Sequence, residues 1–287
     1  MDIVNLTKHY GKLTALDAIS VKDIKGVHGL VGENGAGKTT LMRIIATVLE
    51  QDSGEVVHEN LSWDDKDKVR KIIGYLPQKF GMYNKLTVRE VLEHMAILKD
   101  ISGDIRSETD KAINLVNLED KADSKVGTLS GGMVRRLGIA QAILGNPKIL
   151  IVDEPTSGLD PEERMRFRLL LRDIGMDRIV LFSTHIIDDV GDICDKVTVL
   201  HKGHVMMTGT CGEIIENAKG KIWEVTIPET NIGALLKASV MTDRRRIGNQ
   251  FVVRLISDKI PCNDAVPAEP SIEEGYLYLI HYGGMYA

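Results

Sequence analysis

GENGAGKTT, residues 32–40, follows an apolar run at residues 27–31 and opens a helical pattern at residues 39–49. The stretch fits G-x-x-x-x-G-K-[ST], and its place between a predicted strand and a predicted helix indicates a loop that binds phosphate groups. Successive backbone N–H groups in such a loop form a concave anion site, to which the helix N-terminus adds partial positive charge. The alternative is a glycine-rich turn that binds nothing.

Each residue type in this loop has a chemical task. The glycines let the main chain approach a β-phosphate without a Cβ in the way. Lys38 can reach the β- and γ-phosphates, and the hydroxyl of Thr39 can bind Mg²⁺. The loop therefore predicts a nucleotide ligand together with a magnesium ion.

The composition is that of an ordinary globular chain with much glycine. The 287 residues are enough for one large domain or two modest ones, each with its own core. A net charge of −5 and a pI near 5.9 argue against a protein that binds the phosphate backbone of nucleic acid. With 27 glycines and only 5% aromatic residues, the chain is either flexible or closely approaches a ligand. The phosphate loop favours close approach.

Targeting and redox signals are few. No apolar run approaches the roughly 20 residues of a membrane helix, and the start at residues 1–4 carries no signal-peptide pattern. The three cysteines, Cys194, Cys211 and Cys262, are widely spaced and form no C-x-x-C. They predict reduced cytosolic thiols and no zinc site.

Short apolar runs alternate with helical patterns through most of the chain. Such alternation predicts a largely parallel sheet with helices on both faces. Between about residues 80 and 147 the strands thin out, which indicates a helical insertion, with capping residues at Thr87 and Ser130. The predicted strands after the phosphate loop are residues 72–76, 148–152, 179–182 and 197–200, and the predicted helices are 88–99, 133–144 and 161–173.

The tail from about residue 216 has a different pattern. Residues 223–227 alternate like a half-buried strand, Gly248-Asn249 is typical of a hairpin turn, and Ser271 with Glu274 forms a capping box. The basic run at residues 244–246 could bind an anion, but a solvated strand end is the favoured interpretation.

Polar side chains follow three of the predicted strands. Asp153 and Glu154 end one strand, where they could hold the magnesium shell and polarise an attacking water. His185 follows a second strand and would sense a γ-phosphate, and Gln78 follows a third, where its amide could bind Mg²⁺ or orient water. Ligands of α/β sheets bind at the carboxyl ends of strands, so we expect these residues beside the phosphate loop.

A second candidate anion site lies at residues 129–133. Ser130 would cap a helix, and Gly131 and Gly132 leave its N-terminus open to a phosphate. A tight turn before a helix is the alternative interpretation.

Together, these segments resemble the nucleotide-binding domain of ATP-binding cassette (ABC) transporters over about residues 1–215. Tyr10 matches the aromatic residue that stacks on adenine in that family. Met133 departs from the family, whose signature motif usually has glutamine there. The family's motifs occur in the family's order: the Walker A loop at residues 32–40, the Q-loop at Gln78, the signature at 129–133, Walker B and the catalytic glutamate at 153–154, the D-loop at 157–160 and the switch histidine at 185.

The resemblance implies an α/β fold of the P-loop NTPase type. It implies a mostly parallel core sheet, an N-terminal antiparallel β subdomain, a helical insertion and a small α+β C-terminal appendage. We expect an ABC ATPase domain at residues 1–215, with its helical subdomain at about 85–147, and an accessory domain at residues 216–287.

The resemblance also implies roles for single residues, with ATP and Mg²⁺ as ligands. Glu154, His185 and Gln78 are expected to be catalytic, and Thr39, Gln78 and Asp153 to bind the metal. The residues expected to contact ATP are Tyr10, Gly32, Glu33, Asn34, Gly35, Ala36, Gly37, Lys38, Thr39, Thr40, Ser130, Gly131, Gly132 and Asp160.

The implied activity is ATP hydrolysis coupled to transport. The family implies a dimer that sandwiches two ATP molecules, so that Ser130 of one chain faces the nucleotide held by Lys38 of the other. A second copy of this chain is the favoured partner over a different cassette. The other expected partner is a separate integral membrane permease, which places this chain at the cytoplasmic face of the membrane. Residues 127–133, 139–144 and 270–279 look most like those of bacterial export ATPases.

Two alternative functions stay open at this point. A soluble ABC-type ATPase could act in translation or DNA metabolism, but the single cassette, the absence of a long coiled coil and the acidic charge weigh against a nucleic-acid partner. A non-hydrolysing nucleotide-binding regulator would not require Glu154 and His185. The transported substrate is not encoded in any pattern that we recognise.

Overall fold

The computed structural model describes residues 1–191, 193–236 and 238–283. The chain divides into two compact units, Met1–Val205 and Met206–Ala287. The predicted functional division at residues 1–215 and 216–287 stays a prediction, and the last four residues of that accessory segment lie outside the described residues. Within the described ranges, no helix is both long and apolar enough to cross a bilayer.

A six-stranded sheet dominates residues 27–209, in the order β10-β9-β3-β8-β7-β6. β3 pairs in parallel with β8 and β9, and β7 pairs in parallel with β6 and β8. The carboxyl ends of these strands therefore meet at one edge of the sheet, where the sequence predicts the polar residues. The strands are β3 (Val27–Val31), β6 (Ile73–Leu76), β7 (Ile149–Asp153), β8 (Ile179–Thr184), β9 (Lys196–His201) and β10 (His204–Gly209).

A second, antiparallel sheet is built from the N-terminal part of the chain, in the order β2-β1-β4-β5. It confirms the predicted N-terminal β subdomain. Helix α1 (Lys38–Ile45) joins the two sheets, because its buried side chains belong to one hydrophobic cluster with residues of β1 and β7. The strands of this sheet are β1 (Asp2–Tyr10), β2 (Leu13–Val21), β4 (Ser53–His58) and β5 (Leu61–Ser62).

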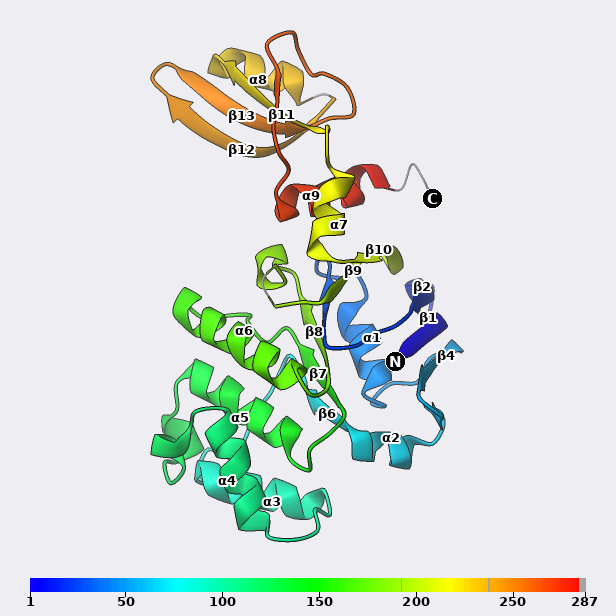
Figure 1. The fold of residues 1–287 in the computed structure, drawn as a ribbon, viewed down its shortest axis with the longest axis vertical. Helices are drawn as coiled ribbons and strands as arrows, with labels where there is room; N and C mark the ends of the chain where they lie inside the picture. Colours follow the sequence, from blue (N-terminus) through cyan, green and yellow to red (C-terminus); the bar gives the residue numbers. More distant parts are fainter. Residues whose placement is uncertain (192, 237, 284–287) are drawn as a thin grey trace. The chain divides into compact units, whose positions relative to one another are not determined.

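The four predicted helices of the first unit are present with shifted ends, whereas the helices Lys66–Ile72 and Ile105–Leu115 were not predicted, and the first of them takes Ile72 from the predicted strand 72–76. α1 ends at Ile45, four residues before the predicted end, and Thr47 beyond it has a left-handed φ of +59°. No strand lies between β6 and β7, and α3, α4 and α5 gather into one helical group (Figure 1), as the predicted insertion requires. The helices are α2 (Lys66–Ile72), α3 (Val88–Leu98), α4 (Ile105–Leu115), α5 (Gly131–Ile143) and α6 (Pro161–Gly175), with 3₁₀ turns η1 (Glu119–Lys121), η2 (Val126–Thr128) and η3 (Ile187–Asp189).

Side-chain caps explain where three helices begin. Thr87 and Glu90 form the predicted capping box of α3, and Ser130 caps α5 through the N–H of Met133 at 3.3 Å. Asp160 caps α6 and accepts the N–H of Glu163 at 2.9 Å, with proline at the first helical position. These caps orient the two segments that the resemblance assigns to the signature motif and the D-loop.

The second unit is a small α+β fold, as predicted. Its sheet has the order β12-β13-β11-β14, and the turn at Gly248 joins β12 to β13. The three arginines at residues 244–246 lie exposed on the edge strand β12, in agreement with a solvated strand end. The elements are α7 (Cys211–Asn217), β11 (Ile222–Ile227), α8 (Glu229–Leu235), β12 (Val240–Ile247), β13 (Gln250–Ile256), β14 (Val266–Pro267) and α9 (Ile272–Tyr282).

Candidate nucleotide site

The predicted phosphate loop connects the fully buried strand β3 to helix α1. Gly37 occupies the N-cap position of α1, and no side chain of the described residues caps this helix. The N–H groups of the first turn are therefore directed at the loop without a side-chain acceptor, and the helix dipole makes this end positive. The geometry is that of an anion site.

Two glycines of the loop are required by packing against protein. A Cβ on Gly32 would lie 2.3 Å from the carbonyl oxygen of Leu200, and a Cβ on Gly37 would lie 2.6 Å from that of Ala15. Gly37 also has a φ of +107°. The sequence analysis explains these glycines by the approach of a phosphate. The structure gives a different reason at these two positions, because a side chain there would collide with the main chain of β9 or β2.

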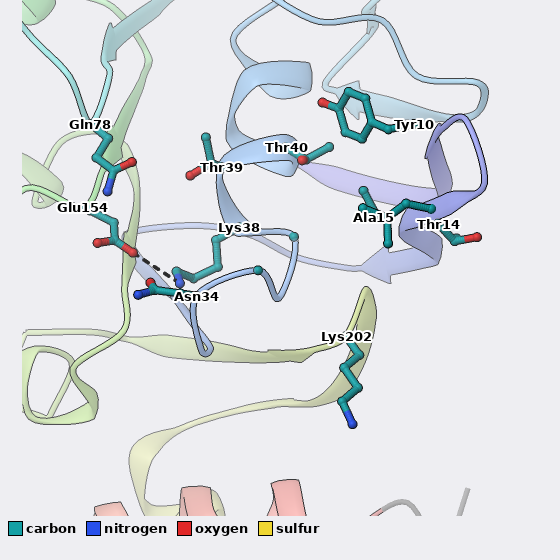
Figure 2. A pocket seen from close by; sticks show the side chains of 13 residues that line it. Tyr10, Thr14, Ala15, Asn34, Lys38, Thr39, Thr40, Gln78, Glu154 and Lys202 are labelled. Atoms are coloured by element: carbon teal, nitrogen blue, oxygen red, sulfur yellow. Dashed lines mark ion pairs between the residues drawn. The ribbon is translucent and has the colours of Figure 1, made fainter.

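A pocket of about 580 Å³ opens beside the loop (Figure 2), within the size range of small-ligand sites. Gln78, Glu154 and Lys38 lie on one side of it, and Tyr10, Thr14 and Ala15 lie on the other. Nine predicted residues line the pocket: Tyr10, Asn34, Gly35, Gly37, Lys38, Thr39, Thr40, Gln78 and Glu154. Four further lining residues were not predicted: Leu13, Thr14, Ala15 and Lys202.

Lys38 is held at the centre of the loop by three acceptors. Its Nζ donates to the carbonyl oxygens of Gly32 at 2.7 Å and Glu33 at 3.1 Å, and lies 3.3 Å from Oε1 of Glu154. The side chains of Lys38 and Glu154 are only 4% and 6% exposed. Because this ion pair is buried, each charge depends on the other for compensation.

Glu154 connects the phosphate loop to the end of β8. It has a left-handed φ of +47°, uncommon for a residue with a side chain, and its N–H donates to Oγ of Ser183 at 2.9 Å. This turn directs one carboxylate oxygen to Lys38 and the other to Nδ1 of His185, which lies 3.0 Å from Oε2. Lys38, Glu154 and His185 thus form a continuous chain of polar contacts.

Asp153, at the end of β7, is a candidate magnesium ligand. Its Oδ1 accepts from Ser183 Oγ at 2.6 Å and from Thr39 Oγ1 at 3.3 Å. Its Oδ2 is buried and has no hydrogen-bond partner among the described residues. Burial raises the pKa of this carboxyl above its ordinary value, although both hydroxyl donors lower it. A buried acceptor oxygen without a partner, on a carboxylate whose other oxygen binds the Thr39 hydroxyl, fits a Mg²⁺ ion and its water shell.

A contact that the sequence did not reveal holds the main chain at Gln78. Arg135 of α5 donates from Nη1 to the carbonyl oxygen of Gln78 at 2.9 Å. This bond links the predicted signature helix to the predicted Q-loop across 57 residues of sequence. No local pattern around Arg135 indicates such a partner.

The predicted residues outside the pocket fall into two groups. One group is close to the pocket without lining it. Three of its members belong to the phosphate loop: Gly32, Glu33 and Ala36. Asp153 is connected to the pocket through its contact with Thr39, and His185 through its contact with Glu154. The residues Ser130, Gly131, Gly132 and Asp160 do not line the pocket of their own chain. Their expected contact with ATP therefore requires a second subunit and stays a prediction.

Comparison with known proteins now adds to this geometry. A profile of the ABC transporter family matches residues 22–157. The chain is 39% identical over 209 residues to an uncharacterized ABC transporter ATP-binding protein, YdbJ, of Bacillus subtilis (strain 168), covering 71% of this chain and 67% of that protein. The chain belongs to the ABC transporter ATP-binding proteins.

Two further relatives have different names, one of which refers to drug resistance and the other to methionine import. This ABC ATP-binding protein is 31% identical over 296 residues to the daunorubicin resistance ATP-binding protein DrrA3 of Streptomyces coeruleorubidus, covering 95% of this chain and 93% of that protein. It is 37% identical over 216 residues to the methionine import ATP-binding protein MetN of Histophilus somni (strain 129Pt), covering 72% of this chain and 63% of that protein.

Solved structures agree with the fold and the activity. The dimeric structure of MJ0796, a bacterial ABC transporter cassette, is similar with a TM-score of 0.65 and 28% identity, covering 73% of this chain and 97% of that chain. A dimeric structure of MJ0796 in a post-hydrolysis state holds ADP and Pi, with 27% identity to this chain. The predicted cassette fold is confirmed, and this ABC ATP-binding protein is an ATPase. ABC cassettes form dimers and work with membrane transporter components.

Proposed function

We propose that this ABC ATP-binding protein hydrolyses ATP in the pocket beside Lys38 and thereby drives export through a separate membrane permease. The observation that carries the proposal is the chain of contacts from Lys38 through Glu154 to His185, at 3.3 and 3.0 Å. It joins a phosphate-binding cation, a candidate proton acceptor and a titratable histidine at the carboxyl edge of one sheet.

The chemistry of hydrolysis follows from these positions. The N–H groups at the start of α1 and the ammonium of Lys38 compensate the charge of the phosphates. Glu154 accepts a proton from the water that attacks the γ-phosphate, and His185 keeps its carboxylate oriented through Nδ1. Thr39, Asp153 and Gln78 would hold Mg²⁺, which neutralises charge on the phosphate oxygens when bound.

The contacts of Lys38 suggest how substrate prepares the site. A phosphate group that recruits Lys38 competes with Glu154 for the same ammonium. Recruitment therefore removes the ammonium from Oε1 of Glu154 and frees that oxygen to accept from water. Binding and activation of the base are in this way coupled through one lysine.

The complete site includes a second subunit. Ser130, Gly131 and Gly132 lie at the N-terminus of α5, and Asp160 lies at the N-terminus of α6, outside the pocket of their own chain. We infer that these residues complete the ATP site of a second copy of this chain, as the helix N-terminus favours phosphate. Met133 does not affect this inference, because its main-chain N–H binds Ser130.

Export is favoured by how far the similarity extends. The match to the daunorubicin resistance protein covers 95% of this chain and so includes most of the second unit, whereas the match to MetN covers 72%. The shared second unit supports a shared type of transport. The proposal places the chain at the cytoplasmic face of the membrane, bound to an integral permease and not to nucleic acid.

A purification from detergent-solubilised membranes tests the partner. An integral membrane protein that co-purifies with the tagged chain, and whose substrate leaves the ATP-containing compartment after reconstitution in vesicles, supports the proposal. Movement of substrate toward ATP would refute export. Recovery of ribosomes or DNA without a membrane protein would refute the transport role.

Phosphate release tests the enzymatic part separately. The wild-type chain is expected to release phosphate from ATP with Mg²⁺, and Lys38→Ala is expected to abolish the release. Activity that is the same in both proteins would come from a contaminant, and a wild-type chain without activity would be a nucleotide-binding regulator.

A further inference from the structure

Behind the candidate catalytic residues lies a fully buried carboxylate, Asp189 in the 3₁₀ turn η3. Its Oδ2 accepts from Oγ1 of Thr156 at 2.6 Å and from Oγ1 of Thr184 at 3.0 Å. Its Oδ1 has no hydrogen bond among the described residues, and Nε of Arg164 lies 4.0 Å from it. None of the four side chains lines the nucleotide pocket.

The two threonines belong to the segments that carry the candidate catalytic pair. Thr156 follows Glu154 by two residues, and Thr184 directly precedes His185. Both are buried, at 2% and 1% exposure. One carboxylate oxygen of Asp189 therefore binds both segments immediately behind the 3.0 Å contact between Glu154 and His185.

The third neighbour extends this connection to the segment after Glu154. Arg164 lies in the first turn of α6, and its N–H donates to the carbonyl oxygen of Asp160 at 2.9 Å. Asp189 thus contacts the chain on both sides of residues 157–160, through Thr156 before them and Arg164 after them. These are the residues that the dimer of the proposed function places near the second subunit.

The composition of this cluster argues against a role in filling space. A carboxylate at 0% exposure is costly unless it is well paired, and its nearest cation is at a distance of 4.0 Å. An apolar side chain would fill the same volume at lower cost. Two directional hydrogen bonds that one oxygen accepts instead restrict the positions of two main-chain segments.

We propose that Asp189 is a positioning residue that holds Glu154 and His185 in register and couples them to residues 157–160. A displacement of residues 157–160 reaches Glu154 through Thr156, and His185 through Asp189 and Thr184. The partner subunit can then control hydrolysis without contacting the base. This inference rests on the proposed function, since it takes Glu154 as the base.

The test compares Asp189→Asn, which keeps the shape, and Asp189→Ala with Asp188→Ala as the matched control. Asp188 is the exposed neighbour in the same turn, and its main-chain oxygen accepts from Nη1 of Arg168 at 2.8 Å. Misplacing reacting groups by about 1 Å can cost about 100-fold in rate. We expect kcat to fall tenfold or more in Asp189→Ala and less in Asp189→Asn, with KM for ATP close to that of the wild type. Asp189→Ala is also expected to lower the melting temperature, because Thr156 and Thr184 lose their buried acceptor, and to remain folded at the assay temperature. Asp188→Ala is expected to behave as the wild type.

A second pair of variants removes the donors to Asp189, and Thr184→Val also removes the acceptor of the Ile186 N–H at 3.0 Å. Thr156→Val and Thr184→Val keep the side-chain volume and leave Asp189 in place, so each is expected to lower kcat without changing KM. In a His185→Ala background, Asp189→Ala is expected to lower kcat by less than a further twofold. The contact between Glu154 and His185, which Asp189 positions in the wild type, is already lost there. A merely structural role would give the same loss in both backgrounds.

The inference is overturned if both Asp189 variants keep kcat within twofold, or if their loss of activity matches the fraction of unfolded protein. It is also overturned if Asp189→Ala costs tenfold in the His185→Ala background. Glu154→Gln, measured alongside, separates the two proposals. Full turnover of Glu154→Gln refutes the assigned base, whereas lost turnover there with unchanged Asp189→Ala refutes the positioning role alone.

Discussion

Replacing Glu154 by glutamine tests the central ion pair, because the change removes one charge and keeps the shape of the side chain. With an effective dielectric constant of about 20, unit charges at the observed 3.3 Å attract by about 5 kcal/mol. Loss of one partner of a buried pair typically costs about 3 to 5 kcal/mol. The glutamine oxygen can still accept from Lys38, and two carbonyl oxygens remain on Nζ, so we expect a loss near the lower limit.

The effect of Glu154→Gln on thermal stability depends on whether nucleotide is bound. A loss of about 3 kcal/mol lowers the melting temperature of a unit of this size by roughly 6 to 12 °C without ATP. In Glu154→Gln, bound ATP gives Lys38 a counter-ion again and does not have to compete with a carboxylate. The rise in melting temperature on addition of Mg-ATP is therefore expected to be larger in the variant than in the wild type. Turnover is expected to fall by about 100-fold to 10,000-fold with the loss of the proton acceptor.

Differential scanning fluorimetry with and without Mg-ATP, isothermal titration calorimetry and phosphate release measure the three effects. Glu162→Gln is the matched control, since Glu162 is exposed on α6 and its pair with Arg166 contributes at most about 1 kcal/mol. Weaker ATP binding by Glu154→Gln than by the wild type would show that Glu154 does not compete with ATP for Lys38. Unchanged stability without nucleotide would show that the pair does not compensate Lys38.

Three further predictions concern parts of the chain away from the pocket. Lys99 donates to three main-chain carbonyls at the end of α5 at 3.0 to 3.2 Å and so caps this helix. Lys99→Met should therefore lower the free energy of unfolding in urea by about 2 kcal/mol. A loss below about 0.5 kcal/mol would contradict this role of Lys99. Burial lowers the pKa of His28 from 6.5 to about 4 in the folded chain. Between these two pH values the unfolded chain binds a proton on His28 and the folded chain does not, so acidification favours unfolding. Stability should therefore fall by about 3 kcal/mol over that window, and His28→Gln should reduce the slope. Arg254 binds the buried Glu274 through two nitrogens at 2.8 and 2.9 Å, so Arg254→Met should destabilise the second unit by about 3 kcal/mol, whereas the exposed Arg246→Met should not.

Local patterns were enough to predict the elements that position the site. The phosphate loop, the acids after β7 and the capping boxes are short-range signals, because the residues that interact are within a few positions in sequence. Parallel pairing of β7 with β8 then brings Asp153 beside Ser183 without further information. The predicted arrangement of strand ends follows directly from this topology.

The contacts that sequence reasoning missed are long-range or depend on a single turn. Asp188 and Asp189 are neighbours of the same type, and only the geometry of η3 decides that one is exposed and the other fully buried. Lys202 lines the pocket beside the bond from the N–H of Gly203 to the carbonyl oxygen of Ala36, which joins the β9–β10 turn to the phosphate loop and which no spacing predicts. Arg135 reaches Gln78 in the same way, from a helix far along the chain.

The packing of the phosphate loop also affects how its mutants should be interpreted. Side chains at positions 32 and 37 would collide with the main chain of β9 and β2 before they reached any ligand. Loss of ATP binding in Gly32→Ala or Gly37→Ala therefore measures misfolding of the loop, and any homologue that tolerates a larger residue there must have moved a strand. At Gly35, a Cβ would have no described atom within 4 Å and φ is +86°. Of the three positions it is therefore the one at which substitution meets no protein atom and reports on backbone freedom and on the approach of the ligand to the pocket.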